Sequence, residues 1–214
     1  MPEPYPVAAL RTLPGVEQRE IDTPHGPARA HISAVDAPRA LLVLGHGAGG
    51  GVTAPDLVTA AEEAVKAQVS VALVEQPYRV AGRKSPAPAH QLDAAWLAVV
   101  DALRGDVPVL CGGRSSGARV ACRTAAGTGA AGVLCLAFPL HPPGRPEKTR
   151  LGELEAVAVP VLIVQGESDP FGMPPEAPGR EVVRLRGNHG LKSDRPGLRA
   201  AVATWLERRL TETA

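Results

Sequence analysis

The stretch VPVLCGGRSSGARVACRTAA, residues 107–126, joins a short apolar run to a helix-like segment through a glycine-rich turn. Its first part has the apolar character of a buried strand, and its last part has helical spacing. Gly113 and Gly117 stand two residues on either side of Ser115, which leaves room for a sharp turn at the serine. Ser116 lacks glycines at these offsets. The stretch therefore predicts a strand, a turn and a helix, with the Ser115 hydroxyl projecting from the turn.

Further apolar runs of strand length recur on both sides of this stretch, at residues 40–45, 70–75, 131–138 and 159–166. Helix-like stretches separate the runs, at residues 55–68, 89–104, 116–126 and 196–211. Unbroken apolar runs are typical of parallel strands that are covered on both faces. The alternation therefore predicts an α/β fold with a mostly parallel, doubly wound sheet.

The N-terminal part of the chain has a different pattern. Residues 15–22 and 28–35 alternate between apolar and polar side chains, and the sequence TPHG at 23–26 has the composition of a turn. These segments predict an antiparallel hairpin in front of the parallel strands. Two proline-rich stretches, 77–88 and 139–146, are expected to be irregular loops that leave strand ends.

The length of 214 residues suits one domain with a core of its own. We expect a single domain over residues 1–214, in which residues 1–14 form a poorly ordered N-terminal arm. The connections leave no room for a separate cap domain. The two proline-rich loops are therefore expected to shape the entrance to any site.

The composition argues against several classes of partner and location. Lys and Arg number 23 against 22 Asp and Glu, so no overall field attracts nucleic acid or an anionic membrane. The start, MPEPYPVAAL, lacks the basic and apolar regions of a secretory leader, and no apolar run is long enough to span a bilayer. Cys111, Cys122 and Cys135 lie in apolar stretches. We expect them to be buried, reduced thiols, which favours a cytoplasmic location.

Two further motifs supply partners for Ser115. Asp169 follows an apolar run in VLIVQGESDPFG, and His189 follows the next strand-like segment in VVRLRGNHG. A serine hydroxyl is a weak nucleophile until a base accepts its proton, and histidine changes protonation near neutral pH. A buried carboxylate can hold the imidazole in the tautomer that accepts this proton. Ser115, Asp169 and His189, in this chain order, are therefore a candidate catalytic triad.

Other interpretations of these acids and histidines stay open. Asp194 is a weaker candidate for the acid, because it follows the histidine instead of preceding it. Under the simpler alternative, His189 is a surface side chain in an Asn-His-Gly turn. His25 and His31 belong to the expected hairpin and His90 to a helix start, so none of these three is a candidate base.

A glycine-rich loop, GHGAGGG at residues 45–51, follows the strand-like run before it. In a hydrolase with a nucleophile on a strand-to-helix turn, such a loop supplies one backbone N–H to the oxyanion of the transition state. The residue after the nucleophile supplies the other. Ala48 or Gly49 is the expected first donor, and Ser116 is the expected second donor.

The same loop also fits the G-x-G-x-x-G pattern of dinucleotide-binding proteins, through Gly45, Gly47 and Gly50, with Glu75 closing the next strand. This alternative is the weaker one. Two strands precede the loop, Pro55 interrupts the expected phosphate-binding helix, and the pattern of serine, aspartate and histidine is left unexplained.

Six segments carry a resemblance to a known family: HGAGG (46–50), EQPYRVAGRKSPAP (75–88), GGRSSGAR (112–119), FPLHPPGRPEK (138–148), VQGESDPFG (164–172) and NHG (188–190). Together they resemble small dienelactone-hydrolase-like α/β-hydrolases. They look most like the subfamily that includes a testis-expressed eukaryotic protein and a subunit of the NSL chromatin complex. The resemblance extends over nearly all of the chain from about residue 15 onward, and the 138–148 segment is its most specific part.

The resemblance places Ser115, Asp169 and His189 on the family's triad positions and the HGAGG loop on its oxyanion position. Dienelactone hydrolase itself has cysteine as the nucleophile, so its lactone substrate does not carry over. Ser116 and Ala118 stand where relatives often have methionine and glycine. Some members of the family have no assigned reaction, so the fold alone does not imply activity.

We therefore expect a serine hydrolase that cleaves an ester or similar acyl bond of a small molecule without a metal or cofactor. The alternative is a non-catalytic hydrolase-like scaffold that binds a partner protein. Aromatic residues in loops after the strands predict an acyl pocket. Two interpretations of the basic residues in these loops stay open: they are surface charge, which we favour, or they form an entrance for a substrate with a carboxylate or phosphate group. The expected substrate contacts are His46, Tyr78, Arg83, Arg114, Phe138, Arg145 and Phe171.

Overall fold

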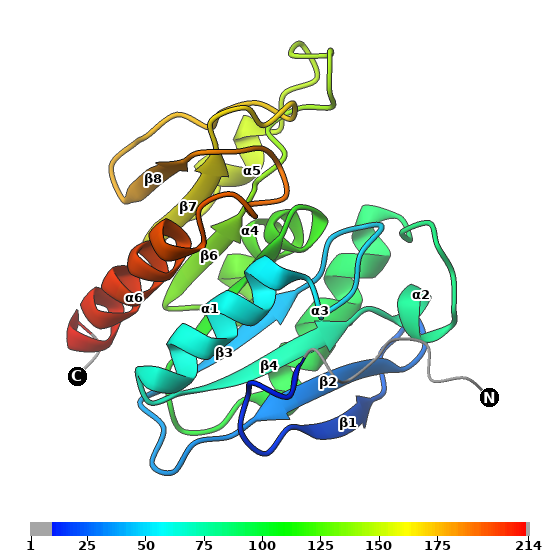
Figure 1. Ribbon diagram of the computed structural model, residues 1–214. Coiled ribbons are helices and arrows are strands. Elements are labelled where there is room, and N and C mark those ends of the chain that lie inside the picture. Colours follow the sequence, from blue (N-terminus) through cyan, green and yellow to red (C-terminus); the bar gives the residue numbers. More distant parts are fainter. Residues whose placement is uncertain (1–9, 213–214) are drawn as a thin grey trace.

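The computed structural model describes residues 10–212, in which strands and helices alternate and the strands gather in one sheet (Figure 1). The strands are β1 (Glu17–Ile21), β2 (Ala28–Ser33), β3 (Ala40–Gly45), β4 (Val69–Glu75), β5 (Val109–Arg114), β6 (Gly132–Leu136), β7 (Val161–Gly166) and β8 (Arg180–Leu185). The helices are α1 (Pro55–Lys66), α2 (Pro77–Val80), α3 (Ala89–Leu103), α4 (Ser116–Thr128), α5 (Leu151–Glu155) and α6 (Arg195–Glu212).

The described strands form an 8-stranded sheet in the order β1-β2-β4-β3-β5-β6-β7-β8. β1 pairs antiparallel with β2, and β2 pairs antiparallel with β4, while all other neighbouring pairs are parallel. The predicted α/β fold with an N-terminal antiparallel hairpin is confirmed. From β3 the chain turns to β4 on one side and then crosses to β5 on the other. In such sheets a site forms at the carboxyl ends of the two strands where the direction reverses.

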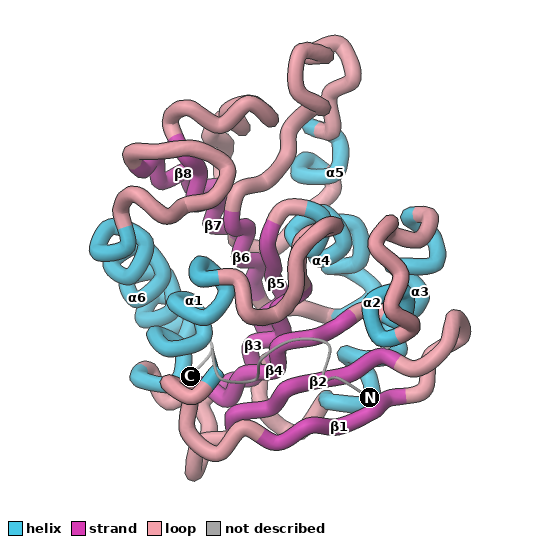
Figure 2. Tube along the Cα trace, turned by 45° about the vertical axis from the view of Figure 1, so that its right-hand side comes forward, coloured by secondary structure: helices cyan, strands magenta, loops and turns pink. Residues whose placement is uncertain are grey.

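Helices cover both faces of the parallel strands (Figure 2). α1 and α6 pack on one face, where the core includes Leu44, Leu57 and Trp205. α3 and α4 pack on the other face, where the core includes Val43 and Trp96. Successive residues of β3 therefore enter different cores, because side chains alternate between the faces of a strand. This explains why the parallel strands have unbroken apolar runs.

One of the two expected loops contains regular structure, so that expectation was wrong in part. Residues 77–80 form the short helix α2, with Pro77 in its first turn. Proline is well tolerated at this position, because the first N–H groups of a helix have no intrahelical acceptor and proline lacks only that donor. The second loop, between β6 and α5, is irregular as predicted and projects beyond the carboxyl ends of the strands (Figures 1 and 2).

The expected N-terminal arm covers residues 1–14, of which residues 1–9 lie outside the described part of the chain. Leu10 and Leu13 are buried and belong to the core beneath α1 and α6. The described part of this segment is therefore packed against the rest of the chain, through two apolar side chains. We propose that the described residues form one domain. Within residues 10–212, no helix combines the length and the apolar character that crossing a membrane requires.

Gly112 of β5 is a position at which the sheet leaves no room for one added methyl group. A Cβ at this position would lie 2.4 Å from the carbonyl oxygen of Leu134 on the neighbouring strand. We expect Gly112→Ala to lower the free energy of unfolding by about 1–3 kcal/mol, because the strands cannot separate without losing their pairing. Gly105→Ala is the matched control, since nothing lies within 4 Å of the added atom. Equal urea midpoints for the two variants would contradict this packing.

Candidate active site

Ser115 occupies a strained turn between β5 and α4. Its backbone has φ 52° and ψ −110°, a conformation that costs a non-glycine residue about 1–3 kcal/mol. The Ser115 N–H donates to the carbonyl oxygen of Leu136 on the adjacent strand, at 2.9 Å. The surrounding sheet therefore holds the turn in place. The turn lies at the carboxyl end of β5, next to the point where the chain, after β3 and β4, crosses to the other side of β3.

The two glycines that flank Ser115 allow β3 to approach this turn. A Cβ on Gly113 would lie 2.4 Å from the carbonyl oxygen of Gly45, and a Cβ on Gly117 would lie 2.3 Å from the same oxygen. Both distances are below any real contact of this kind. The glycines are therefore required by space, as their spacing in the sequence suggested.

The structure joins the Ser115, His189 and Asp169 side chains in one chain of hydrogen bonds. His189 Nε2 lies 3.0 Å from Ser115 Oγ, and His189 Nδ1 lies 2.8 Å from Asp169 Oδ2. A carboxylate only accepts hydrogen bonds, so Nδ1 carries the proton and Nε2 is left as the acceptor for the serine hydroxyl. The Asp169 side chain is 1% exposed and that of His189 is 17% exposed. Water therefore has little access to the carboxylate, while the imidazole can still meet a ligand.

Gln165 is a residue of the candidate site that we did not expect from the sequence. Its Nε2 donates to Asp169 Oδ2 at 2.9 Å, and it is also close enough to donate to the Phe138 and Gly172 carbonyl oxygens. The other carboxylate oxygen, Oδ1, accepts the N–H of Phe171 at 2.9 Å. Both oxygens of Asp169 are therefore fixed. The signal for Gln165 was present in the sequence, because it is the only polar residue in the apolar run that precedes Asp169.

Asp194, the weaker candidate for the acid, has a different role. Its Oδ1 accepts the N–H of Gly197 and its carbonyl oxygen accepts the N–H of Leu198, so it caps the start of α6.

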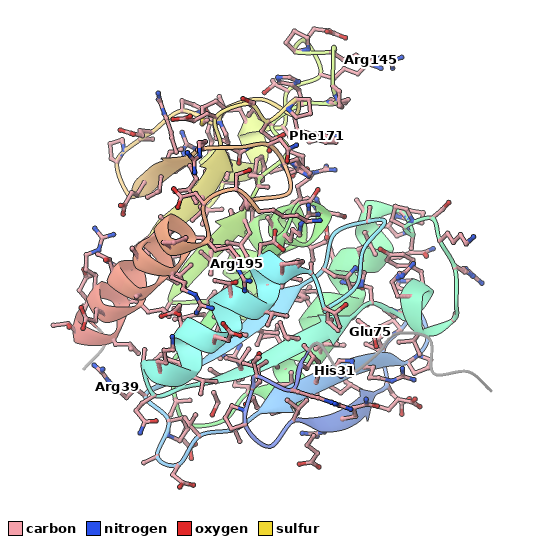
Figure 3. All side chains as sticks on the ribbon, in the orientation of Figure 1. His31, Arg39, Glu75, Arg145, Phe171 and Arg195 are labelled. Carbon is pink, nitrogen blue, oxygen red and sulfur yellow. The ribbon has the colours of Figure 1, made fainter. Side chains whose placement is uncertain are left out.

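Phe171 lies at the site, in the loop after β7, with its ring centroid 4.3 Å from that of His189 (Figure 3). It is the expected aromatic contact whose partly exposed ring lies beside the candidate base.

The loop after β3 runs alongside the turn at Ser115. A Cβ on Gly47 would lie 3.5 Å from the Ser115 Cβ. Within residues 10–212, the N–H groups of Ala48, Gly49 and Ser116 have no protein acceptor. The expected oxyanion donors are thus free to bind a ligand, and they remain a proposal.

Three of the expected substrate contacts are buried and have structural roles. His46 is 3% exposed, and its ring bridges the Gly47 carbonyl oxygen and the Gln76 N–H. Tyr78 is 5% exposed and donates its hydroxyl to the Ala48 carbonyl oxygen. Phe138 is fully buried in the core under α3 and α4. In this structure all three side chains therefore contact the protein itself, because loop residues after the strands fold back under their neighbours.

The three expected arginine contacts lie in different surroundings. Arg114 is engaged by Asp56 and by the His189 backbone. Arg83 is exposed and lines a cavity of about 210 Å³ beside Tyr78 and α2. Arg145 is exposed on the projecting loop (Figure 3). The structure therefore does not bring these guanidinium groups together around Ser115.

The dinucleotide alternative gains no support from the geometry. Residues 46–54 separate β3 from the start of α1 at Pro55, whereas a phosphate-binding fingerprint needs a tight turn into the helix. Glu75 is engaged internally, 3.1 Å from His31 and 3.5 Å from Arg29 (Figure 3). Burial alone would raise the pKa of Glu75, but the His31 hydrogen bond and the nearby positive charges lower it below its usual value. This carboxylate therefore binds side chains of the neighbouring strand β2.

A family model described as an alpha/beta hydrolase domain matches residues 38–192, a span that includes all three hydrogen-bonded side chains. The chain belongs to this family. No curated protein matches it. Among solved structures, this α/β hydrolase is similar to XC6422 from Xanthomonas campestris, an α/β serine hydrolase without a lid. The two share 19% identity with a TM-score of 0.75, and the match covers 90% of this chain and 94% of the other.

Two further structures of the same fold are similar at comparable length. Est1E from Butyrivibrio proteoclasticus is 18% identical, with a TM-score of 0.72 over 91% of this chain and 99% of its own. Dienelactone hydrolase from Anabaena variabilis is 16% identical, with a TM-score of 0.68 over 92% of this chain and 97% of its own. At these identities the likeness establishes the fold. In the described part of this α/β hydrolase, no three His, Cys, Asp or Glu side chains form a group that could hold a metal ion.

His46 should make the stability of this hydrolase depend on pH. Burial lowers the pKa of His46, so the unfolded chain binds this proton more readily than the folded chain does. The stability that neutral His46 supports is therefore present above about pH 6.5 and is lost as the pH falls below that value. We expect a slope of up to about 1.4 kcal/mol per pH unit from this group, absent in His46→Gln. Urea unfolding at several pH values measures it, with exposed His25→Gln as the control. A slope that is unchanged in His46→Gln would contradict a buried, neutral imidazole.

Proposed function

We propose that this α/β hydrolase is a serine hydrolase that cleaves an ester or similar acyl bond of a small molecule. Ser115 is the nucleophile, His189 the general base and Asp169 the residue that orients the imidazole. The observation that carries the proposal is the continuous hydrogen-bond chain from the buried Asp169 carboxylate to the Ser115 hydroxyl on a strained turn. A nucleophile needs this arrangement, because the base must be held in the accepting tautomer before it meets the hydroxyl.

The reaction proceeds in two halves. Ser115 Oγ attacks the carbonyl carbon while its proton passes to His189 Nε2, and the negatively charged oxygen is bound by the N–H of Ser116 and that of Ala48 or Gly49. The tetrahedral intermediate collapses as His189 returns the proton to the leaving alcohol, which leaves an acyl group on Ser115. Water then attacks this acyl group with His189 again as the base, and the acid is released.

Two observations bear on the substrate. The structural neighbours include a serine hydrolase without a lid, and Est1E with ferulic acid bound. In this chain the described loops form no separate cap over Ser115, and Phe171 offers an apolar ring beside the base. We propose a small ester with an apolar or aromatic acyl part. An anionic substrate would have to use Arg83 or Arg145, because Arg114 is engaged within the protein.

We also propose a subfamily and a cellular location for this hydrolase. The segment 138–148 supports membership of the subfamily of the testis-expressed protein and the NSL complex subunit. All three cysteines are buried free thiols, and the Cys122 and Cys135 sulfur atoms are 3.5 Å apart, which is a hydrogen-bond contact and not a disulfide. We propose a cytoplasmic location on this basis.

The nucleophile is tested by comparing two adjacent serines. We expect Ser115→Ala to reduce the hydrolysis of p-nitrophenyl acetate by about 10⁴-fold or more. Ser116→Ala should retain most of the activity, because an alanine at this position keeps the backbone N–H that binds the oxyanion. Steady-state kinetics on both variants, with folding checked by circular dichroism, give the comparison. Equal losses in the two variants would contradict the assignment. A wild-type protein with no turnover on any short ester would favour the non-catalytic scaffold.

The acid is tested by comparing two aspartates. Asp169→Asn should lower kcat by about 10⁴-fold, because the amide can stabilise the wrong imidazole tautomer. Asp194→Asn should leave kcat within a few fold, since Asp194 caps α6 and has no contact with the imidazole. A larger loss of kcat in Asp194→Asn than in Asp169→Asn would show that the wrong acid was chosen.

A further inference from the structure

The guanidinium of Arg114 lies where three loops of the site meet. Arg114 is the last residue of β5 and directly precedes Ser115. Its Nε lies 2.8 Å from Asp56 Oδ2 at the start of α1, and its Nη2 donates to the carbonyl oxygen of His189 at 3.0 Å. Its Nη1 faces the loop after β3, since a Cβ on Gly47 would lie 3.0 Å from it. One side chain therefore touches the loops that carry the nucleophile, the base and the expected oxyanion donors.

Asp56 gives this guanidinium a fixed anchor. The Asp56 side chain is 1% exposed, and its other oxygen, Oδ1, accepts the N–H of Leu57 at 3.0 Å. Burial raises the pKa of Asp56, and the Arg114 charge lowers it part of the way back. Asp56 also lies in the first turn of α1, where the helix dipole favours a negative charge. A buried carboxylate with one cationic partner is strongly destabilised when that partner is removed.

The hydrogen bond from Arg114 to the His189 carbonyl oxygen fixes the backbone from which the imidazole side chain extends. His189 lies in the connection between β8 and α6, outside any strand. The hydrogen bonds of its ring fix the side chain, and its backbone carbonyl oxygen accepts one further hydrogen bond. Arg114 supplies it with a planar group whose donors have a fixed relative direction. Lysine has one ammonium and cannot reproduce this fork.

We propose that Arg114, anchored by Asp56, is a positioning residue that holds the His189 backbone so that the imidazole Nε2 lies within hydrogen-bonding distance of Ser115 Oγ. This inference rests on the proposed serine hydrolase function. It replaces the expectation that Arg114 binds substrate. The side chain is 21% exposed, and the protein uses two of its three nitrogens, so the geometry favours an internal role.

Kinetics separate positioning from substrate binding. We expect Arg114→Gln and Arg114→Lys each to lower kcat for a neutral p-nitrophenyl ester by about 10- to 100-fold, with KM within about twofold, since a small misplacement of the base has this effect. Asp56→Asn should lower kcat in the same direction. The double variant Arg114→Gln with Asp56→Asn should have a kcat no lower than that of Arg114→Gln alone, because both changes break the same ion pair.

Arg119→Gln is the matched control. Arg119 lies on α4, its side chain has a similar exposed fraction of 26%, and its guanidinium binds the Glu153 carboxylate through two nitrogens. Glutamine at this position keeps the backbone N–H that donates to the Ser115 carbonyl oxygen. Loss of the Arg119 guanidinium removes an ion pair of the same kind without touching the site. We expect kcat for this variant to stay within about twofold of the wild type, because a partly exposed ion pair contributes little elsewhere in the fold.

A second readout does not depend on catalysis. The His189 Nδ1–H that is bonded to Asp169 gives a low-field proton NMR resonance, assigned by its loss in His189→Gln. This resonance should broaden or disappear in Arg114→Lys and Asp56→Asn and persist in Arg119→Gln. If the wild type has no esterase activity but the resonance behaves in this way, the proposed function fails and the positioning role stands.

Two outcomes would overturn the positioning role. One is an unchanged resonance with kcat within twofold of the wild type in Arg114→Lys. The other is a rise in KM confined to anionic esters with kcat unchanged, which would return Arg114 to substrate binding. If Arg114→Gln fails to fold, the milder Arg114→Lys and Asp56→Asn variants decide the question by the same two readouts.

Discussion

The close approach of β3 to the turn after β5 is the constraint on which the rest of the site depends. The Gly45 carbonyl oxygen occupies the space where side chains at 113 and 117 would stand, so the turn must have glycine at both positions. The same approach brings the loop after β3 alongside Ser115 and forces the serine into a positive φ. The strain is maintained because the neighbouring strands, each buried on both faces, cannot move apart.

From this turn the other parts of the site follow in order around the sheet. β7 delivers Asp169, with Gln165 from the same strand holding its carboxylate. The connection after β8 delivers His189, which the Arg114 guanidinium ties to the turn and to α1. A chain of polar contacts therefore spans from one helix to the far side of the sheet. The buried Asp56 needs its arginine in this arrangement, because a buried carboxylate without a cationic partner is strongly destabilising.

Much of the fold could be predicted from the sequence because its signals are local. Unbroken apolar runs identified the parallel strands, and glycines at fixed offsets identified the turn at Ser115. The order of Ser115, Asp169 and His189 was also informative, since each follows a strand and the carboxyl ends of parallel strands meet at one edge. The short helix at Pro77 was missed because its four residues have no periodicity to detect.

The side chains whose surroundings we did not foresee are those whose contacts come from distant parts of the chain. His46 and Phe138 follow strands, as ligand-binding residues do, but neighbouring segments bury both. Arg114 has the charge to bind an anion. Only the fold reveals that its guanidinium already contacts Asp56 and the His189 carbonyl oxygen. Gln165 carried a usable signal, because a polar residue in a buried strand needs a reason to be there.

The central claim, an activated Ser115, is tested most directly by covalent labelling with a fluorophosphonate followed by mass spectrometry. Trypsin releases Ser115 and Ser116 together in the peptide SSGAR, residues 115–119, so fragmentation must locate the adduct within it. We expect one phosphonyl group per chain on Ser115, formed in the native wild type and lost in His189→Gln. An unlabelled protein, or an adduct on Ser116, would contradict it.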